Sequence, residues 1–140
     1  MGSITDGNRI SVPVRQDTDV LVACQKGRAL AARQGLLNDE QVIVVIAISE
    51  VANNIIRYAQ CGEIVLSAVQ CNGQSGIQVV ARDDGPGIPD IAQALQDGYS
   101  SGGGLGLGLS GAKRLMDEFD IISEVGRGTV VTMAKWRSQV

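Results

Sequence analysis

The sequence of 140 residues contains no histidine, and only 3% of its residues are aromatic. The lack of histidine excludes Ser-His-Asp catalysis, histidine metal sites and phosphorylation of a histidine within these residues. The scarcity of aromatic residues means that a core must be built from Val, Ile, Leu and Ala. Hydrophobic residues make up 44% of the chain, which is enough apolar material for a folded core and argues against global disorder.

Cysteine, basic charge and long apolar runs are also scarce. The three cysteines, Cys24, Cys61 and Cys71, are scattered, which is typical of free thiols in a reducing cytosol rather than of disulfides or a metal cluster. The net charge of -3 argues against nucleic acid as the main partner, because binding to phosphates needs a basic surface. No apolar run approaches the roughly 18 residues of a membrane span, and the opening MGSITDGNR lacks the apolar segment of a signal peptide. We therefore expect a cytoplasmic protein that binds neither nucleic acid nor membrane.

The apolar periodicity divides the chain into strands and helices, and we expect residues 1–140 to form one domain. Pro13 indicates an edge strand, and Gly35 is a stop signal for the first helix. Asn72-Gly73 is typical of a hairpin turn. In chain order we predict a strand at 10–14, a helix from Asp17 or Thr18 to 34, a helix capped by Asn38 that runs to 58, strands at 63–70 and 77–82, helices at 91–96 and 107–118, and strands at 121–125 and 129–136. This order predicts an α+β two-layer sandwich, with helices on one face of a mixed or antiparallel sheet.

A narrow polar stripe interrupts the otherwise apolar second helix. Glu50 and Asn54 lie one turn apart on the same face, beside Asn53 and Arg57. One interpretation is that the stripe faces solvent, as it does on most amphipathic helices. However, the stripe holds an acid, two amides and a base rather than the Lys/Glu mixture of a solvated face. A carboxylate and an amide at this spacing can hold a nucleophile and a hard cation such as Mg²⁺, which prefers oxygen ligands and keeps waters and substrate phosphates in its shell.

The sequence ARDDGPGIPD follows the predicted strand at 77–82. One interpretation is an ordinary tight turn, since Asp-Gly and Pro-Gly are common turn dipeptides. The functional interpretation is that Asp83 points into a pocket and accepts a hydrogen bond from an amine. Gly85 and Gly87 would then allow the backbone to approach a flat ring closely.

The third unusual segment is YSSGGGLGLGLSGAKRLMDEF, residues 99–119. Its GLGLSG matches the dinucleotide fingerprint G-x-G-x-x-G, but that fingerprint needs a preceding strand in a βαβ unit, and a loop is predicted here. A P-loop is excluded because Ala112 follows Gly111 where Lys is required. The remaining interpretation is a flexible glycine loop that leads into a helix N-terminus, which favours an anion site covered by a lid.

These motifs occur in a recognisable order: E-x-x-x-N on a helix, D-x-G-x-G after a strand, a glycine-rich loop that opens a helix, and GRGT before a strand. The order resembles the GHKL (Bergerat) ATP-binding fold of histidine kinase catalytic domains, gyrase-type ATPases and bacterial anti-sigma factor kinases. The resemblance covers nearly the whole chain. It is closest to the compact serine/threonine protein kinases of bacterial partner-switching systems.

The resemblance implies a role for each matching residue. Glu50 would activate the attacking hydroxyl as the catalytic residue, Asn54 would bind Mg²⁺, and Arg57 would contact phosphate. Asp83 would read the adenine amine. The remaining residues implied to bind ATP are Gly85, Gly87, Gly104, Leu105, Gly106, Leu107, Gly108 and Thr129, the last through water.

The chain departs from the related kinases before the glycine box, where Ser100, Ser101 and Gly102 stand in place of an arginine. This leaves open which side chain neutralises the γ-phosphate. Lys113 and Arg114 are the candidates, and the alternative is that both simply face solvent.

The function implied by the resemblance is ATP-dependent phosphorylation of a Ser or Thr on a separate STAS-domain antagonist or scaffold, as in a stressosome. Release of the kinase would then activate a PP2C-type phosphatase. The alternative is an anti-sigma factor that sequesters a sigma factor and phosphorylates its antagonist. A third reading is a nucleotide-binding module without transfer activity.

Overall fold

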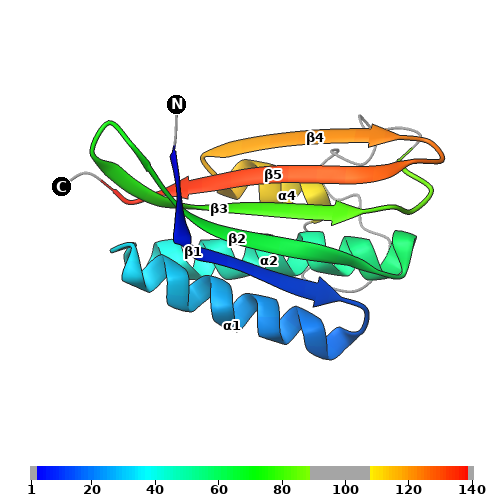
Figure 1. Ribbon diagram of the computed structural model, residues 1–140, viewed down its shortest axis with the longest axis horizontal. Helices are drawn as coiled ribbons and strands as arrows, with labels where there is room; N and C mark the ends of the chain where they lie inside the picture. Colours follow the sequence, from blue (N-terminus) through cyan, green and yellow to red (C-terminus); the bar gives the residue numbers. More distant parts are fainter. Residues whose placement is uncertain (1–2, 89–107, 139–140) are drawn as a thin grey trace.

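The computed structural model describes residues 3–88 and 108–138 of the chain (Figure 1). The predicted helix at 91–96 and the glycine-rich segment before Gly108 lie outside these residues. The elements in chain order are β1 (Ser3–Val14), α1 (Asp17–Arg33), α2 (Asn38–Ala59), β2 (Gly62–Cys71), β3 (Gln74–Asp83), α4 (Gly108–Leu115), β4 (Glu118–Glu124) and β5 (Gly128–Trp136).

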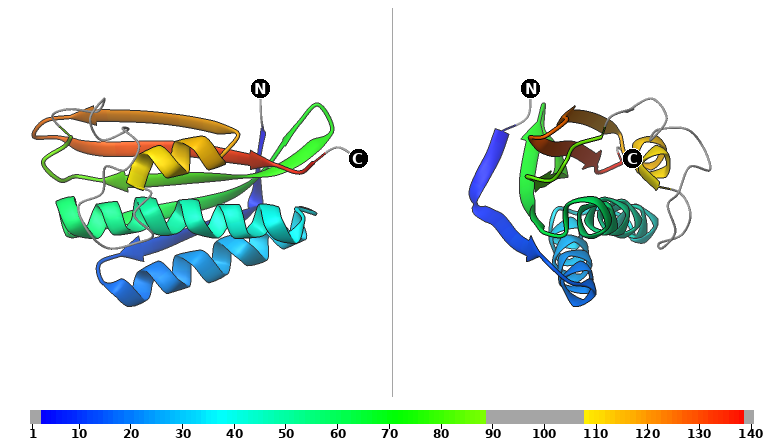
Figure 2. Two further views of the ribbon diagram at one scale, coloured as in Figure 1. Left: turned by 180° about the vertical axis from the view of Figure 1, so that it is seen from behind. Right: turned by 90° about the vertical axis from the view of Figure 1, so that its right-hand side faces the viewer.

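The strands form one five-stranded sheet in the order β1-β2-β3-β5-β4, and every neighbouring pair is antiparallel. The described helices lie side by side on one face of this sheet, with α2 between α1 and α4 (Figure 2). This arrangement confirms the predicted α+β two-layer sandwich and selects the antiparallel form of its sheet. It also places β1, which contains Pro13, at an edge, where a missing N–H breaks no central ladder.

Local signals account for the turns. Asn72 and Gly73 have φ angles of 53° and 80°, which is the left-handed backbone that a two-residue hairpin turn requires. The helix α1 ends just before Gly35, whose φ is 86°. Both features agree with the sequence prediction.

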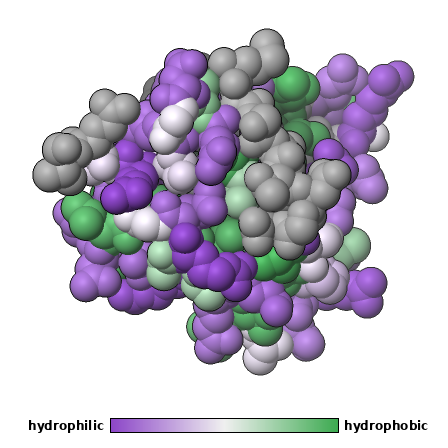
Figure 3. Space-filling model, turned by 60° about the vertical axis from the view of Figure 1, so that its left-hand side comes forward, coloured by the Kyte–Doolittle hydropathy of each residue, from purple (hydrophilic) through white to green (hydrophobic). Residues whose placement is uncertain are grey.

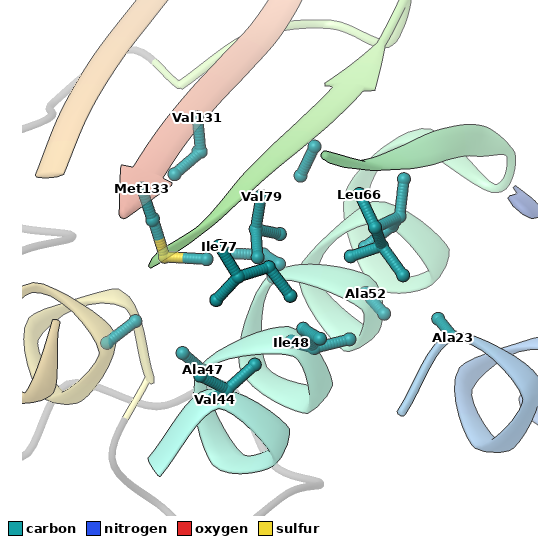
Figure 4. Close-up of a cluster of buried hydrophobic side chains, with 14 of the residues drawn as sticks. Ala23, Val44, Ala47, Ile48, Ala52, Leu66, Ile77, Val79, Val131 and Met133 are labelled. Atoms are coloured by element: carbon teal, nitrogen blue, oxygen red, sulfur yellow. The ribbon is translucent and has the colours of Figure 1, made fainter. Parts of the chain in front are cut away.

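The core between the two layers is aliphatic, as the composition predicts (Figure 4). The predicted stripe of α2, with Val44, Ile48, Val51 and Ile55, is at most 2% exposed. It packs against inward-facing residues of the central strands, such as Leu66 of β2. Full burial of one such side chain stabilises the fold by about 1.5–3 kcal/mol, so this stripe contributes strongly to holding the helical layer on the sheet.

The sequence led us to expect no segment that is long and apolar enough to span a membrane. By length and composition alone this expectation was wrong, because α2 is both long enough and apolar enough. It has 22 residues and a mean hydropathy of 1.5 over its most apolar window. In the structure, this hydropathy reflects the position of α2 in the middle of the helical layer. The core helix of a soluble protein passes the same test. On the face seen in Figure 3, hydrophilic residues predominate and apolar residues lie in separate small groups.

The helix predicted at 107–118 is shorter than expected. It ends at Leu115, and Glu118 is already the first residue of β4. The N–H of Asp117 donates to the Ala134 carbonyl at 2.9 Å, and the Asp117 carboxylate accepts the Trp136 N–H at 2.8 Å. Pairing with β5 therefore replaces the last turn of the helix.

The helix starts also differ from the prediction. Asp17 is the first residue of α1, and it is the Asp19 carboxylate that accepts the N–H groups of Arg15 and Gln16, at 2.9 and 3.2 Å. At the start of α2, Glu40 rather than Asn38 accepts the Leu37 N–H, at 2.7 Å. In both helices the acid of the first turn satisfies N–H groups that the helix itself leaves unpaired.

Candidate functional site

A polar row closes the helix-facing side of the sheet at one end. Asp83 of β3 is paired with Thr129 of β5, and Thr129 is paired with Ser123 of β4. Directly opposed residues of antiparallel strands point to the same face. The next row on this face is apolar and consists of Ala81, Val131 and Ile121. The sheet therefore changes from core to polar site within one step along the strands.

Asp83 is buried, with 9% of its surface exposed. Its Oδ1 accepts the N–H of Gly85 at 2.9 Å, which fixes the carboxylate at the start of the loop after β3. Within the described residues, no donor is recorded for Oδ2. One oxygen of a buried carboxylate is thus left to accept a hydrogen bond from a ligand.

Ser123 connects the row to the loop after β3. Its Oγ lies 2.8 Å from Thr129 Oγ1 and 3.2 Å from the Gly128 carbonyl, and it accepts the Ile88 N–H at 2.7 Å. Sequence reasoning missed this residue, because it belongs to none of the motifs. Only the pairing of β4 with β5 brings it to Thr129.

The two glycines of the predicted D-x-G-x-G motif lie where the backbone is crowded. A Cβ at Gly85 would lie 2.5 Å from the Ala59 Cβ at the end of α2. Gly87 has φ 80°, and a Cβ there would lie 2.4 Å from the Glu124 carbonyl oxygen. The Gly126 N–H donates to the Pro86 carbonyl at 2.9 Å. The loop after β3 is therefore held against α2 on one side and the β4–β5 turn on the other. These segments meet at the right-hand end of the molecule in Figure 1.

The polar stripe of α2 is not a solvated face. Glu50 is only 6% exposed, Asn53 and Asn54 are half-buried, and Arg57 is exposed. The Oε2 atom of Glu50 accepts the N–H of Gly108 at 3.1 Å. Asn54 makes no side-chain hydrogen bond to the residues that the structure describes. Its carbonyl oxygen is therefore available as a hard donor, which fits an ion such as Mg²⁺ that takes few ligands from protein.

The helix α4 begins at Gly108, the last glycine of the predicted phosphate-binding segment. The other residues predicted for this segment, Gly104, Leu105, Gly106 and Leu107, lie outside the described part of the chain. Lys113 and Arg114 are exposed in the last turn of α4, away from its N-terminus. This exposed position agrees with the alternative that both side chains face solvent. That either side chain neutralises the γ-phosphate remains a prediction.

The described groups comprise a carboxylate at a sheet end, a carboxylate and an amide on a helix, and a glycine at a second helix N-terminus. These are the kinds of group that the predicted nucleotide site requires. Residues 13–135 match the family model of the histidine kinase-like ATPase domain, and the chain belongs to this family.

Curated relatives give the class within the family. The chain is 44% identical over 125 residues to Serine/threonine-protein kinase RsbT of Bacillus subtilis (strain 168), covering 89% of this chain and 94% of that protein. It is 30% identical over 114 residues to Anti-sigma F factor of Caldanaerobacter subterraneus subsp. tengcongensis, covering 77% and 78% of the two chains. The chain is thus an ATP-using serine/threonine protein kinase with relatives among partner-switching regulators, as the motif order predicted.

Solved structures support the fold alone. The structure of the RsbU and RsbW domains of Rv1364c from Mycobacterium tuberculosis aligns with a TM-score of 0.63 at 19% identity, over 93% of this chain and 33% of that one. The structure of the mycobacterial sensor histidine kinase MprB aligns with a TM-score of 0.54 at 18% identity, over 93% of this chain and 100% of that one. Both agree with the predicted GHKL fold.

Proposed function

We propose that residues 1–140 form a single cytoplasmic kinase domain that transfers the γ-phosphoryl group of ATP to a Ser or Thr of a STAS-domain partner in a stress-response pathway. The observation that carries this proposal is the buried carboxylate of Glu50. It lies one turn from Asn54 on α2 and contacts the first residue of α4. Such a carboxylate, beside the proposed metal ligand and the proposed phosphate-binding segment, is suited to accept a proton during phosphoryl transfer.

The nucleotide would be held by both layers. Asp83 accepts a hydrogen bond from the adenine amine through Oδ2, and Thr129 adds a second acceptor through water. The backbone at Gly85 and Gly87 lines the base. The glycine-rich residues 104–107 would supply backbone N–H groups to the phosphates, and Arg57 would add a positive charge there. Gly108, whose own N–H is donated to Glu50, would hold the end of this segment at the start of α4.

The side-chain oxygen of Asn54 would hold Mg²⁺, whose chemistry when bound is to neutralise charge on the phosphates. Glu50 orients the acceptor hydroxyl and takes its proton. A bond forms between the acceptor oxygen and the γ-phosphorus, and the bond from that phosphorus to the bridging oxygen of ADP breaks. The protein contributes mainly by positioning the reactants and by stabilising charge.

The proposed partner class rests on the resemblance of the motifs to the partner-switching kinases, with which the likeness to a serine/threonine-protein kinase is consistent. In this proposal the substrate is a STAS-domain antagonist or scaffold, and release of the kinase activates a PP2C-type phosphatase. Likeness to anti-sigma F factors supports the alternative, in which the protein sequesters a sigma factor and phosphorylates its antagonist.

A transfer assay with matched proteins tests the proposal. Purified kinase is mixed with γ-labelled ATP, Mg²⁺ and either STAS-domain proteins or sigma factors of the same organism, with Glu50→Gln as the inactive control. Label on a STAS protein with wild type but not with Glu50→Gln supports the kinase function. Stable capture of a sigma factor would favour the alternative. ATP binding without transfer to any STAS protein would leave only a nucleotide-binding module and contradict the proposal.

A further inference from the structure

Among the residues that the structure describes, Ser123 joins both segments around the proposed adenine site through its side chain. It is half-buried in β4, and its hydroxyl contacts Ile88 of the loop after β3 and Gly128 and Thr129 at the start of β5. The loop carries the glycines proposed to line the base, and Thr129 is paired with Asp83. A change at Ser123 would therefore reach the site without contact to the nucleotide.

The hydrogen-bonding capacity of a hydroxyl limits how these contacts can be shared. A serine hydroxyl has one proton and two lone pairs. The Ile88 N–H uses one lone pair at 2.7 Å, and the contact to the Gly128 carbonyl at 3.2 Å uses the proton. The distance of 2.8 Å between Ser123 Oγ and Thr129 Oγ1 fits either hydroxyl as the donor. Because the Gly128 carbonyl can only accept and takes the Ser123 proton, we assign the proton of this contact to Thr129.

This assignment has a consequence for Thr129. With its own proton directed at Ser123, the Thr129 hydroxyl has only lone pairs to offer a ligand or a bridging water. The Asp83 carboxylate, whose Oδ1 already accepts the Gly85 N–H, likewise serves as an acceptor here. Adenine presents an amine at C6, whereas hypoxanthine and guanine present a carbonyl there, which needs a donor. With Asp83 and Thr129 both acting as acceptors, these two described side chains leave the C6 carbonyl of a 6-oxo purine without a donor, and an unpaired polar group is an effective way to reject a ligand.

We infer that Ser123 is a specificity-determining positioning residue: it holds Thr129 as a hydrogen-bond acceptor and so makes the site selective for a 6-amino purine. The inference rests on the proposed ATP site. It adds the residue that decides whether Thr129, the second side chain proposed to read the base, accepts or donates a hydrogen bond. Removal of the Ser123 hydroxyl would free the Thr129 proton to turn toward a C6 carbonyl.

The test is equilibrium binding of ATP and ITP to the full chain, because ITP differs from ATP at the C6 group that the site is proposed to read. We expect Ser123→Ala to lower the ratio of ATP to ITP affinity by about 3- to 10-fold, the range for loss of one net hydrogen bond. Ser123→Thr, which keeps the hydroxyl, should retain the wild-type ratio. Ser11→Ala is the matched control, since Ser11 is an exposed serine whose hydroxyl donates to Glu63 at the far edge of the sheet.

A double-mutant cycle separates positioning from a general structural role. In a Thr129→Val background, Ser123→Ala should cause no further change in the ATP to ITP ratio, since there is no threonine proton left to direct. An equal additional change in that background would overturn the inference.

Asp83→Asn distinguishes failure of the inference from failure of the site. If Asp83→Asn lowers the ratio and Ser123→Ala does not, the role of Ser123 is wrong and the adenine site stands. If Asp83→Asn also leaves the preference for ATP over ITP and GTP unchanged, the proposed adenine site itself is wrong. Thermal unfolding of each variant verifies that the protein is folded in each measurement. Ser123→Thr is the milder change at this position because it keeps the hydroxyl.

Discussion

The N–H of Gly108 donates to the Glu50 carboxylate, with 3.1 Å between nitrogen and Oε2. This contact joins the middle of α2 to the first residue of α4. The proposed catalytic base therefore also anchors one end of the proposed phosphate-binding segment. Two kinds of substitution can separate these roles.

Glu50→Gln keeps an oxygen that can accept the Gly108 N–H but removes the group that takes a proton. We expect it to bind ATP with an affinity close to wild type and to lose about 10²- to 10⁴-fold in transfer rate, the usual contribution of a general base. Glu50→Ala should lose transfer equally and also unfold at lower temperature, because an N–H left without a partner costs about 1–3 kcal/mol. Single-turnover transfer and thermal unfolding measure the two effects. Transfer by Glu50→Gln at the wild-type rate would show that Glu50 is not the base.

Asn54 and Asn53 form a matched pair for the metal site. They are adjacent, half-buried amides on α2, and about 100° of helix rotation separates their directions. Because Asn54 shares the Glu50 side of the helix, Asn54→Ala should weaken ATP binding in Mg²⁺ and leave binding in EDTA unchanged. Asn53→Ala should affect neither. Isothermal titration under the two conditions decides, and equal losses for both variants would contradict the assignment.

Gly87 and Gly126 separate steric crowding from backbone strain. Their φ angles are 80° and 84°, but a Cβ at Gly87 would lie 2.4 Å from the Glu124 oxygen, whereas a Cβ at Gly126 would meet nothing within 4 Å. Gly126→Ala should therefore cost only the strain of a left-handed alanine, about 1–2 kcal/mol. Gly87→Ala should cost more in urea unfolding and also weaken ATP binding, because the loop after β3 must move. Equal losses of stability would contradict the crowded position of Gly87.

Glu40 links the two ends of the described fold and should make stability depend on pH. Burial would raise the pKa of this carboxyl. The Ser138 hydroxyl, the N–H groups of Leu37 and Ser138 and the Lys135 ammonium more than offset that effect and hold the pKa below its ordinary value.

A carboxyl whose pKa is lower in the folded state stabilises the protein above its unfolded pKa of about 4.3, and this stabilisation is lost as the pH falls through the folded pKa. Glu40→Gln should thus be less stable than wild type at pH 7 and lose less stability on acidification from pH 5 to 3. Ser138→Ala, which removes one donor, should show an intermediate slope. Urea unfolding at several pH values measures this, and parallel curves for wild type and Glu40→Gln would refute the role of Glu40.

Sequence patterns predicted those parts of the fold that depend on neighbouring residues. The hairpin at Asn72-Gly73, the end of α1 before Gly35 and the apolar stripe of α2 each follow from local backbone preference or from the period of a single helix. The order of these elements was enough for the two-layer class. The ends of elements were less predictable: α4 stops at Leu115 because Asp117 pairs with β5, a contact that no local pattern contains.

The sequence by itself determined the aliphatic core and the type of the described elements, and it predicted the motif residues of the proposed site, because periodicity, turn chemistry and motif spacing depend on residues close together in the chain. Only the tertiary structure decided how the site is assembled. Strand register places Ser123 beside Thr129 and Thr129 beside Asp83, and packing of α4 on α2 brings Gly108 to Glu50. Glu40, in the first turn of α2, accepts the N–H of Ser138, 98 residues away. These contacts depend on pairing and packing between distant segments, whose geometry is set when the whole core closes.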